Sequence, residues 1–444
     1  MNTRTLWIGL GLVTLLSFSV LLFFGKEIYR QKPPIPEKVV SESGEVLFTA
    51  QQIRDGQNVW QSIGGQQVGT VWGHGAYLAP DWSADWLHRE SQTILGGWSQ
   101  TEFGILFDNL APEKQAMLEV RLQKALRANT YDEQTGILRL SADRVNAVKN
   151  NTAYYAGLFM DDTSLENLRE AYSIPAGTIK DKERMAAMNA FFFWAAWACV
   201  TERPGSDLTY TSNWPPDPVI GNKPSAGVVL WTGFSVIMLL VGVGLLAYYN
   251  ARNRSDVLDK SLLPQNDPLG GLNPTPSMKA VLKYYWVVVG LILLQILTGV
   301  ITAHFGVEGN SFYGLDLDNL MPYSIARTWH IQLALFWIAT AWLAAGLYIA
   351  PAVSGHEPKF QKFGVNLLFF ALIVIVVGSM AGEWMGVMQK LGLVKNFWFG
   401  HQGYEYVDLG RFWQIFLFAG FIIWLFLMFR ALWPALIKKS ESRE

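Results

Sequence analysis

The segment Met321–Pro351 constrains the fold most, because it is a long apolar run that contains a histidine and an arginine. It reads MPYSIARTWHIQLALFWIATAWLAAGLYIAP, and roughly 20 apolar residues are enough for a helix to cross a bilayer. Arg327 and His330 lie near its start. An ionisable side chain inside a membrane span is costly and therefore marks a candidate functional site. The segment thus predicts a membrane helix that carries a functional group.

His330 has two interpretations that this segment alone leaves open. In the first, the imidazole forms a structural hydrogen bond with a neighbouring helix. In the second, it is a haem axial ligand, and Arg327, one turn earlier on the same side, pairs with a haem propionate. Small residues at helical spacing would leave a shallow groove beside the imidazole for a flat ring. These residues are Ala334, Ala341 and Ala345.

Composition and charge exclude several classes of protein. The chain has 444 residues, of which 51% are hydrophobic and 16% charged, as is typical of a membrane protein. Its formal net charge is −1, so no nucleic-acid partner is predicted. Cys199 is the only cysteine, which excludes an internal disulfide framework and the CxxCH attachment of a c-type haem. The histidines available for haem or metal binding are His74, His88, His304, His330, His356 and His401.

Six apolar runs predict membrane spans. The run Leu6–Phe24 lacks a small-residue cleavage site and is interpreted as an anchor within residues 1–25. Arg184–Val200 is also apolar, but its length and flanking charges predict a buried or interfacial helix. Residues 26–225 therefore form a predicted extracytoplasmic domain, and residues 226–444 contain five spans. The five spans are Gly227–Tyr249, Tyr284–Ala303, Tyr323–Ile349, Val365–Met385 and Phe412–Leu432.

Basic residues set the expected orientation, since cytoplasmic loops are rich in Lys and Arg. Lys359 and Lys362 follow the fourth span, and further basic residues follow the second and sixth. All these segments lie on one side if every run spans, so that side is cytoplasmic. Lys26, Arg30 and Lys32 favour the opposite orientation but are outnumbered. We expect a multi-pass protein of the inner (cytoplasmic) membrane of a bacterium, with residues 26–225 on the periplasmic side.

This topology places several chemically capable side chains at the outer face. His304 and Glu308 end the third span, and His330 lies shallow in the fourth. A membrane-dissolved electron donor could meet a shallow haem there. The other residues expected on that side are His74, Tyr77, Glu405 and Asp408.

Five segments carry a resemblance to a known family. They are GQNVWQSIGGQQVGTVWGHGAYLAPDWSADWLHRE (56–90), FFFWAAWACVTERPG (191–205), TYTSNWPPDP (209–218), TWHIQLALFW (328–337) and GHQGYEYVDLGRFWQ (400–414). They resemble the single-chain, quinol-dependent nitric oxide reductases of the haem–copper oxidase superfamily. The resemblance implies a mainly α fold: a polytopic membrane helical bundle with an extracytoplasmic cytochrome c-like domain lacking haem c. The stretch Trp60–Gly64, which has no cysteine pair, agrees with that loss.

The resemblance also implies roles for individual residues. His330 matches the axial ligand of the low-spin haem b, with Arg327 at a propionate. His304 and Glu308 match the quinol-binding pair, so quinol or menaquinol is the expected electron donor. A further set of positions holds calcium, or water in its place, beside haem propionates, and oxygen ligands suit calcium. These positions are Gly75, Tyr77 and Glu405.

Structural interpretations remain open for several of these residues. His304 and Glu308, at i and i+4, are also explained as a solvated helix end. Glu405 and Asp408 could supply only negative charge to a helix N-terminus, and Tyr77 could be a core aromatic. Gln332, about 200° around the helix from His330, is predicted to form an interhelical hydrogen bond. The histidines assigned structural or solvated roles are His74, His88, His356 and His401.

Other groups that the family needs have no counterpart in this sequence. In the family, the second haem b ligand, the haem b3 ligand and the three histidines of the non-haem iron come from later helices. Because the chain ends at Glu444, we expect an N-terminal portion of the enzyme: a fragment, a truncated product or half of a split enzyme. Its partners would then be the missing C-terminal helices. Converting two NO to N2O needs a binuclear iron site, so we expect the chain alone to be inactive.

Two functions remain as hypotheses. The leading one is the quinol-oxidising, low-spin haem b part of a nitric oxide reductase in the lipid bilayer. The alternative is a catalytically inactive membrane fragment or scaffold. A transporter is disfavoured, because no inverted repeats are evident. The sequence leaves open which quinol is used, whether calcium or water fills the outer site, and whether the chain forms a homodimer.

Overall fold

The computed structural model describes residues 3–253, 270–312, 314–402 and 408–437. The chain divides into two compact units. The first contains residues 1–53, 83–150 and 192–225, and the second contains residues 54–82, 151–191 and 226–444. Four helices contribute to both units: α2 (Ala50–Ser62), α3 (Trp82–Phe103), α5 (Ala142–Phe159) and α7 (Lys182–Val200).

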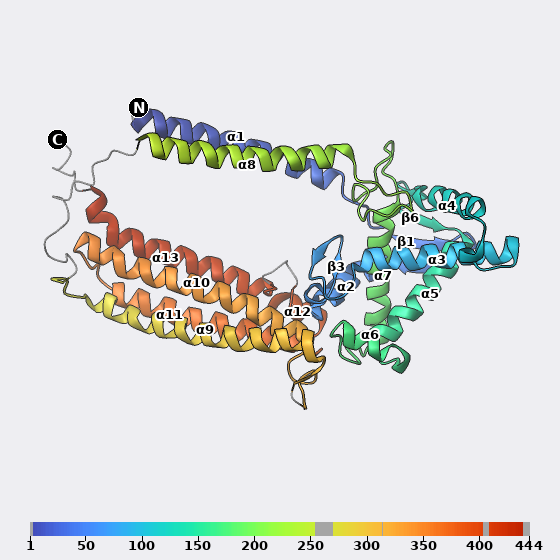
Figure 1. The fold of residues 1–444 in the computed structure, drawn as a ribbon. Helices are drawn as coiled ribbons and strands as arrows, with labels where there is room; N and C mark the ends of the chain where they lie inside the picture. The colour runs from blue at the N-terminus through green and yellow to red at the C-terminus, as the bar shows by residue number, and fades with distance from the viewer. Residues whose placement is uncertain (1–2, 254–269, 313, 403–407, 438–444) are drawn as a thin grey trace. The chain divides into compact units, whose positions relative to one another are not determined.

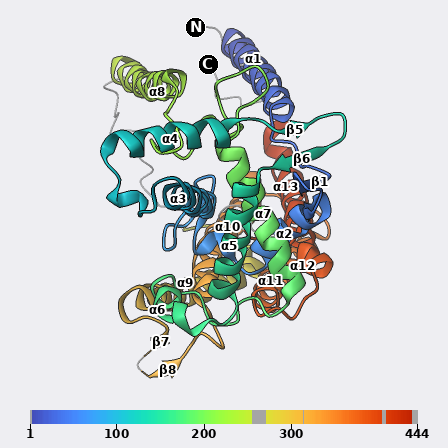
Figure 2. The same ribbon diagram turned by 90° about the vertical axis from the view of Figure 1, so that its right-hand side faces the viewer.

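The first unit combines helices with a small mixed sheet. Its strands are β1 (Lys38–Ser41), β2 (Val46–Thr49), β5 (Tyr131–Asp132) and β6 (Ile137–Leu140). The sheet order is β2-β1-β6-β5, with β1 antiparallel to β2 and parallel to β6 (Figure 2). The unit also contains α1 (Thr3–Arg30) and α4 (Pro112–Arg127).

Helix α7 supplies much of the core of the first unit. Its side chains Phe192 and Phe193 are fully buried, and Phe193 makes an edge contact with Trp86 on α3. A helix packed in this way on all sides does not face lipid. The prediction that Arg184–Val200 forms a buried helix, and not a span, is confirmed.

The second unit contains a bundle of four long helices (Figure 1). They are α9 (Pro276–Glu308), α10 (Tyr323–Ser354), α11 (Gln361–Val387) and α13 (Arg411–Ile437). Apolar residues from all four form one buried cluster that includes Leu291, Leu333, Leu372 and Leu427. The starts of α9 and α11 lie at the same end, because the Tyr284 hydroxyl donates to the Val365 carbonyl at 2.6 Å.

Several further elements complete the second unit. The helices are α6 (Glu166–Ala171), α8 (Ala226–Asn253) and α12 (Leu393–Phe399), with 3-10 turns at Gly65–Gln67 (η1) and Thr163–Leu165 (η3). The strands are β3 (Thr70–Val71), β4 (His74–Gly75), β7 (Ser311–Phe312) and β8 (Leu315–Asp316). A further 3-10 turn, η2 (Phe107–Asn109), belongs to the first unit.

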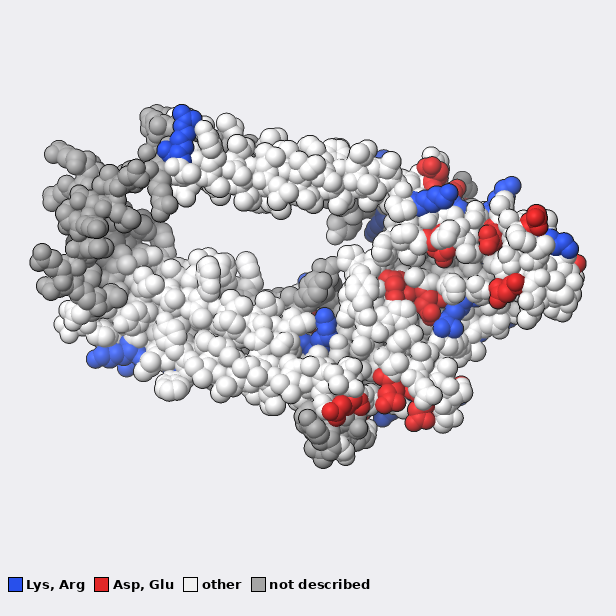
Figure 3. All heavy atoms as spheres, viewed as in Figure 1, with Lys and Arg blue, Asp and Glu red and all other residues white. Residues whose placement is uncertain are grey.

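Six helices of the described chain are long and apolar enough to cross a membrane: α1, α8, α9, α10, α11 and α13. They coincide with the six predicted runs, and each helix extends beyond its run. The surface over the four bundle helices carries few charged side chains in Figure 3, while Lys, Arg, Asp and Glu gather over α3 to α6. The chain is therefore a polytopic membrane protein.

Candidate functional site

His330 lies on α10 and faces α9. Its Nδ1 atom is 2.9 Å from the backbone carbonyl oxygen of Gln295. A carbonyl oxygen can only accept a hydrogen bond, so Nδ1 is the donor, and in the neutral imidazole Nε2 is the nitrogen with the lone pair. The ring also lies against Gly299, where a Cβ atom would be 2.7 Å from the imidazole Cε1. The imidazole is thus oriented by α9 and presents an unprotonated nitrogen.

The surroundings of His330 fit a flat iron-bound group. A ligating histidine usually donates its other ring N–H to a carbonyl or carboxylate, which fixes the tautomer and the ring orientation. The Gln295 carbonyl accepts such a hydrogen bond from His330, and the Gln295 side chain in turn accepts one from the Trp337 indole at 2.7 Å. The small residues expected to line a groove are all partly exposed on α10: Ala334, Ala341 and Ala345.

Arg327 is half-buried one turn before His330, as predicted, and its guanidinium donates to the side-chain carbonyl of Gln67 in η1. Gln67 in turn donates through its amide nitrogen to the carboxylate of Asp408. A neutral amide therefore bridges the cation and the anion. This arrangement holds the arginine beside the entrance of α10.

Asp408 is the centre of a buried polar cluster that sequence reasoning missed. It is fully buried and accepts hydrogen bonds from the side-chain amides of Gln66 and Gln67. The Thr328 hydroxyl lies 3.3 Å from its Oδ2 atom and 2.9 Å from Nε2 of His401. Burial lowers the pKa of His401, an effect that the Asp408 carboxylate partly offsets. We call these residues the Asp408 cluster: Gln66, Gln67, Thr328, His401 and Asp408.

This cluster changes the interpretation of two residues. The Asp408 carboxylate accepts hydrogen bonds from the two glutamine amides and lies near the Thr328 hydroxyl. Negative charge at the start of α13 is therefore not its only role. His401 is buried within the second unit, whereas His74, His88 and His356 are exposed. The sequence signal for this cluster was the glutamine pair that follows Gly64-Gly65. Two adjacent amides in a short turn need hydrogen-bond partners when they are buried.

His304 and Glu308 come together at the end of α9. The Nε2 atom of His304 is 3.0 Å from Oε2 of Glu308, and the two side chains are 11% and 43% exposed. The predicted i, i+4 pair therefore lies within ion-pair distance, and it is an ion pair when the histidine is protonated. Its mostly buried imidazole and more exposed carboxylate can each accept a proton.

The predicted calcium positions are only partly described. Gly75 lies in β4 with a φ of +135°, and Tyr77 is 74% exposed, with its hydroxyl donating to the Gly73 carbonyl at 3.2 Å. Glu405 lies outside the described residues. Among the residues that are described, no three His, Cys, Asp or Glu side chains gather as metal ligands. The calcium site stays a prediction.

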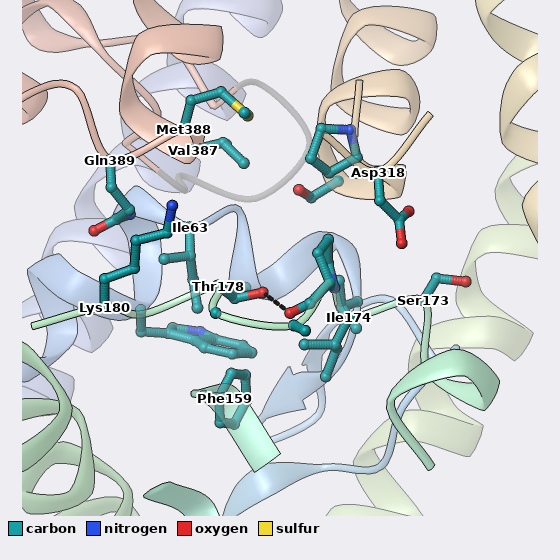
Figure 4. Close-up of a pocket in the computed structure, with 18 of the residues that line it drawn as sticks. Ile63, Phe159, Ser173, Ile174, Thr178, Lys180, Asp318, Val387, Met388 and Gln389 are labelled. Carbon is teal, nitrogen blue, oxygen red and sulfur yellow. Dashed lines mark hydrogen bonds between the residues drawn. The ribbon is translucent and has the colours of Figure 1, made fainter. Parts of the chain in front are cut away.

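An open pocket of about 700 Å³ lies elsewhere in the second unit (Figure 4). Trp60, Trp82 and Phe159 supply aromatic lining, while Val387 and Met388 lie across from Phe159. Trp60 and Ile63, from the stretch without a cysteine pair, both line it. Its described lining residues include neither His330 nor the pair His304 and Glu308.

Comparison with known families accounts for both parts of the chain. Residues 36–216 match the family model for the cytochrome c-like domain of the nitric oxide reductase protein NorB. Residues 279–442 match the family model described as cytochrome c and quinol oxidase polypeptide I. A comparison with curated proteins gave no match. Proteins of the haem–copper oxidase family typically bind haem. The two matches support a NorB-type nitric oxide reductase of the haem–copper oxidase superfamily, and the mainly helical fold and the six spans agree with them.

Proposed function

We propose that the chain oxidises quinol and passes the electrons to a low-spin haem b held by His330, as the electron-delivering part of a nitric oxide reductase. The observation that carries this proposal is the hydrogen bond between Nδ1 of His330 and the Gln295 carbonyl. It makes Nε2 the nitrogen through which a neutral imidazole would bind iron. When bound there, haem supplies a one-electron acceptor.

Arg327 would hold a propionate of that haem. Its guanidinium is half-buried one turn from His330, and Gln67 fixes its position without neutralising its charge. A cation held by a neutral partner keeps most of its attraction for an incoming carboxylate. Gly75, Tyr77 and Glu405 would hold calcium, or water in its place, on the same outer side.

His304 and Glu308 would bind the quinol and take its two protons. Oxidation of a quinol releases two electrons and two protons, so a neighbouring imidazole and carboxylate provide one acceptor each. The close contact of His304 with Glu308 supports this role. Along α9, His304 is five residues beyond Gly299, which touches His330, so the axial separation is roughly 7.5 Å. Electrons would therefore travel only a short distance.

The division of the chain and its orientation belong to the same proposal. Residues 1–25 would anchor the chain, residues 26–225 would form the periplasmic cytochrome c-like domain, and residues 226–444 would form the haem–copper oxidase-like membrane domain. Lys359, at the end of the bundle away from His304, supports a cytoplasmic location for that end. Its backbone carbonyl accepts a hydrogen bond from Arg430 at 2.5 Å.

The test uses the full chain, purified in detergent with added haem. Wild-type protein should show the Soret absorbance of a bound b haem, and His330→Ala should lose it, while His356→Ala, a change of an exposed histidine, should not. His304→Ala should slow haem reduction by a soluble quinol analogue without slowing reduction by dithionite. Absence of haem binding by the wild type would favour the scaffold alternative. Equal loss of both reduction reactions would point to misfolding and would contradict the quinol assignment.

A further inference from the structure

Glu383 is a carboxyl group buried inside a helix that spans the membrane. It lies on α11, is 1% exposed, and accepts a hydrogen bond on Oε1 from the side-chain amide of Gln332 on α10, at 2.5 Å. This confirms the interhelical hydrogen bond predicted for Gln332. Oε2 has no hydrogen-bond partner in the described structure. The candidate haem and quinol residues do not account for this group.

No described basic side chain neutralises Glu383. On α10 its neighbours are Gln332 and the indole of Trp329. From α9, Lys283 contacts α11 at Asn366 and Phe369. Phe369 is 14 residues before Glu383 and so roughly 21 Å away along the axis. An ionised carboxylate would lie unpaired in a membrane interior, which is costly. A neutral carboxylic acid, with its proton on Oε2, avoids this cost.

The remaining elements packed against this part of α11 contribute the Asp408 cluster and apolar groups. From α13, Trp413 lies over Gly378 and donates its indole hydrogen to the Phe399 carbonyl. Gly386, about one turn after Glu383 on α11, lies against the backbone nitrogen of His401, and Lys390 lies over the ring of the neighbouring Trp384. These contacts bring His401, its partner Asp408 and Lys390 to this part of α11.

Thr328 connects the two sites. It lies one helical turn before Gln332 on α10, about 6 Å along the axis, and its hydroxyl contacts Asp408 and His401. A hydroxyl can accept one proton while donating another, and a bridging water would complete the path from Thr328 to Glu383. The chain of polar contacts from Thr328 and Asp408 continues through Gln67 to Arg327, which is half-buried and so nearer the surface.

We propose that Glu383 stores a proton within the membrane and exchanges it with the surface through Thr328 and Asp408. In the discharging step the O–H bond of Glu383 breaks and an O–H bond forms at Asp408. The negative charge moves from Asp408 to Glu383, where the Gln332 amide stabilises it. This inference is independent of the haem and quinol assignments, because it concerns only side chains of the chain itself.

Infrared spectroscopy of the full chain in lipid tests the proposal directly. A protonated carboxylic acid has a carbonyl stretching band separate from that of carboxylates, and the band shifts when D2O replaces the proton. The wild type should show one such band that Glu383→Gln removes. If Glu383→Gln removes no band, the carboxyl is not protonated and the proposal is wrong.

The exchange rate of that band tests the route. Thr328→Val, which removes the hydroxyl, should slow the shift in D2O by about tenfold or more, and Thr328→Ser should restore the wild-type rate. The matched control is Thr340→Val, a change of another fully buried threonine on α10, further from Asp408. Equal rates in Thr328→Val and Thr340→Val would overturn the route. If Thr328→Val does not fold, Thr328→Ser still tests it, because a slowed rate there would contradict a role for the hydroxyl alone.

Discussion

The imidazole of His330 packs directly against the backbone of Gly299. A Cβ atom at position 299 would lie 2.7 Å from Cε1 and 2.8 Å from Nδ1 of the ring. These distances are shorter than any ordinary carbon contact, and the ring cannot retreat without losing its hydrogen bond to the Gln295 carbonyl. Gly299 therefore sets the position of the imidazole on α10.

We predict that Gly299→Ala displaces His330 and weakens haem binding. Overpacking of this kind typically costs about 1–3 kcal/mol, so haem content at limiting haem should fall clearly below that of the wild type. Absorbance of the low-spin haem measures this. Gly290→Ala, on the same helix but with open space at its Cβ, is the control and should bind haem normally. Equal haem content in both variants would refute the positioning role.

The buried histidine of the Asp408 cluster should make stability depend on pH. Burial lowers the pKa of His401 from its ordinary value near 6.5. Below about pH 6.5 the unfolded chain takes up a proton that the folded chain does not, so stability falls as the pH falls. The slope contributed by one histidine is at most about 1.4 kcal/mol per pH unit.

Thermal unfolding of the detergent-solubilised chain at a series of pH values checks this. His401→Gln should flatten the decline in stability below about pH 6.5, while His88→Gln, a change of an exposed histidine, should not. An unchanged pH profile in His401→Gln would mean that other groups cause the decline.

Local patterns in the sequence were enough to predict the membrane helices and the groups that lie within one element. Hydrophobic runs predict all six spans, and helical spacing predicts that His304 meets Glu308. It also predicts that Gln332 points away from His330 towards a neighbouring helix, where it binds Glu383. These features depend on periodicity alone.

The Asp408 cluster could not be predicted in the same way. Gln66 and Asp408 are separated by 342 residues, and neither belongs to a regular apolar pattern. Their contact depends on how η1 packs against the start of α10, which no local period encodes. Glu383 was missed for a related reason. A single carboxyl group in an apolar run does not reveal from sequence alone whether it is buried or which residues surround it.

The first unit contains a buried ion pair whose disruption should be costly. Arg144 on α5 donates to Glu90 on α3 at 2.7 Å, and the two side chains are 5% and 1% exposed. Glu90→Ala would leave a guanidinium buried without its partner, which typically costs about 3–5 kcal/mol. Chemical unfolding should show this loss. The control is Glu102→Ala at the exposed pair with Arg121, where about 0–1 kcal/mol is expected. A similar cost at both sites would show that burial does not decide the outcome.

Close packing between α11 and α12 should depend on Gly382. A Cβ atom there would lie 1.8 Å from the Phe399 carbonyl oxygen, which accepts the indole hydrogen bond of Trp413 at 3.0 Å. Gly382→Ala must therefore push α12 away and weaken that hydrogen bond, at a cost of about 1–3 kcal/mol or more. Thermal unfolding in detergent measures the loss. Gly420→Ala, whose Cβ would meet Leu368 at an ordinary 3.7 Å, should leave the midpoint nearly unchanged. A stable Gly382→Ala variant would mean that α12 can shift freely, and that the backbone next to Glu383 is less tightly held than its packing indicates.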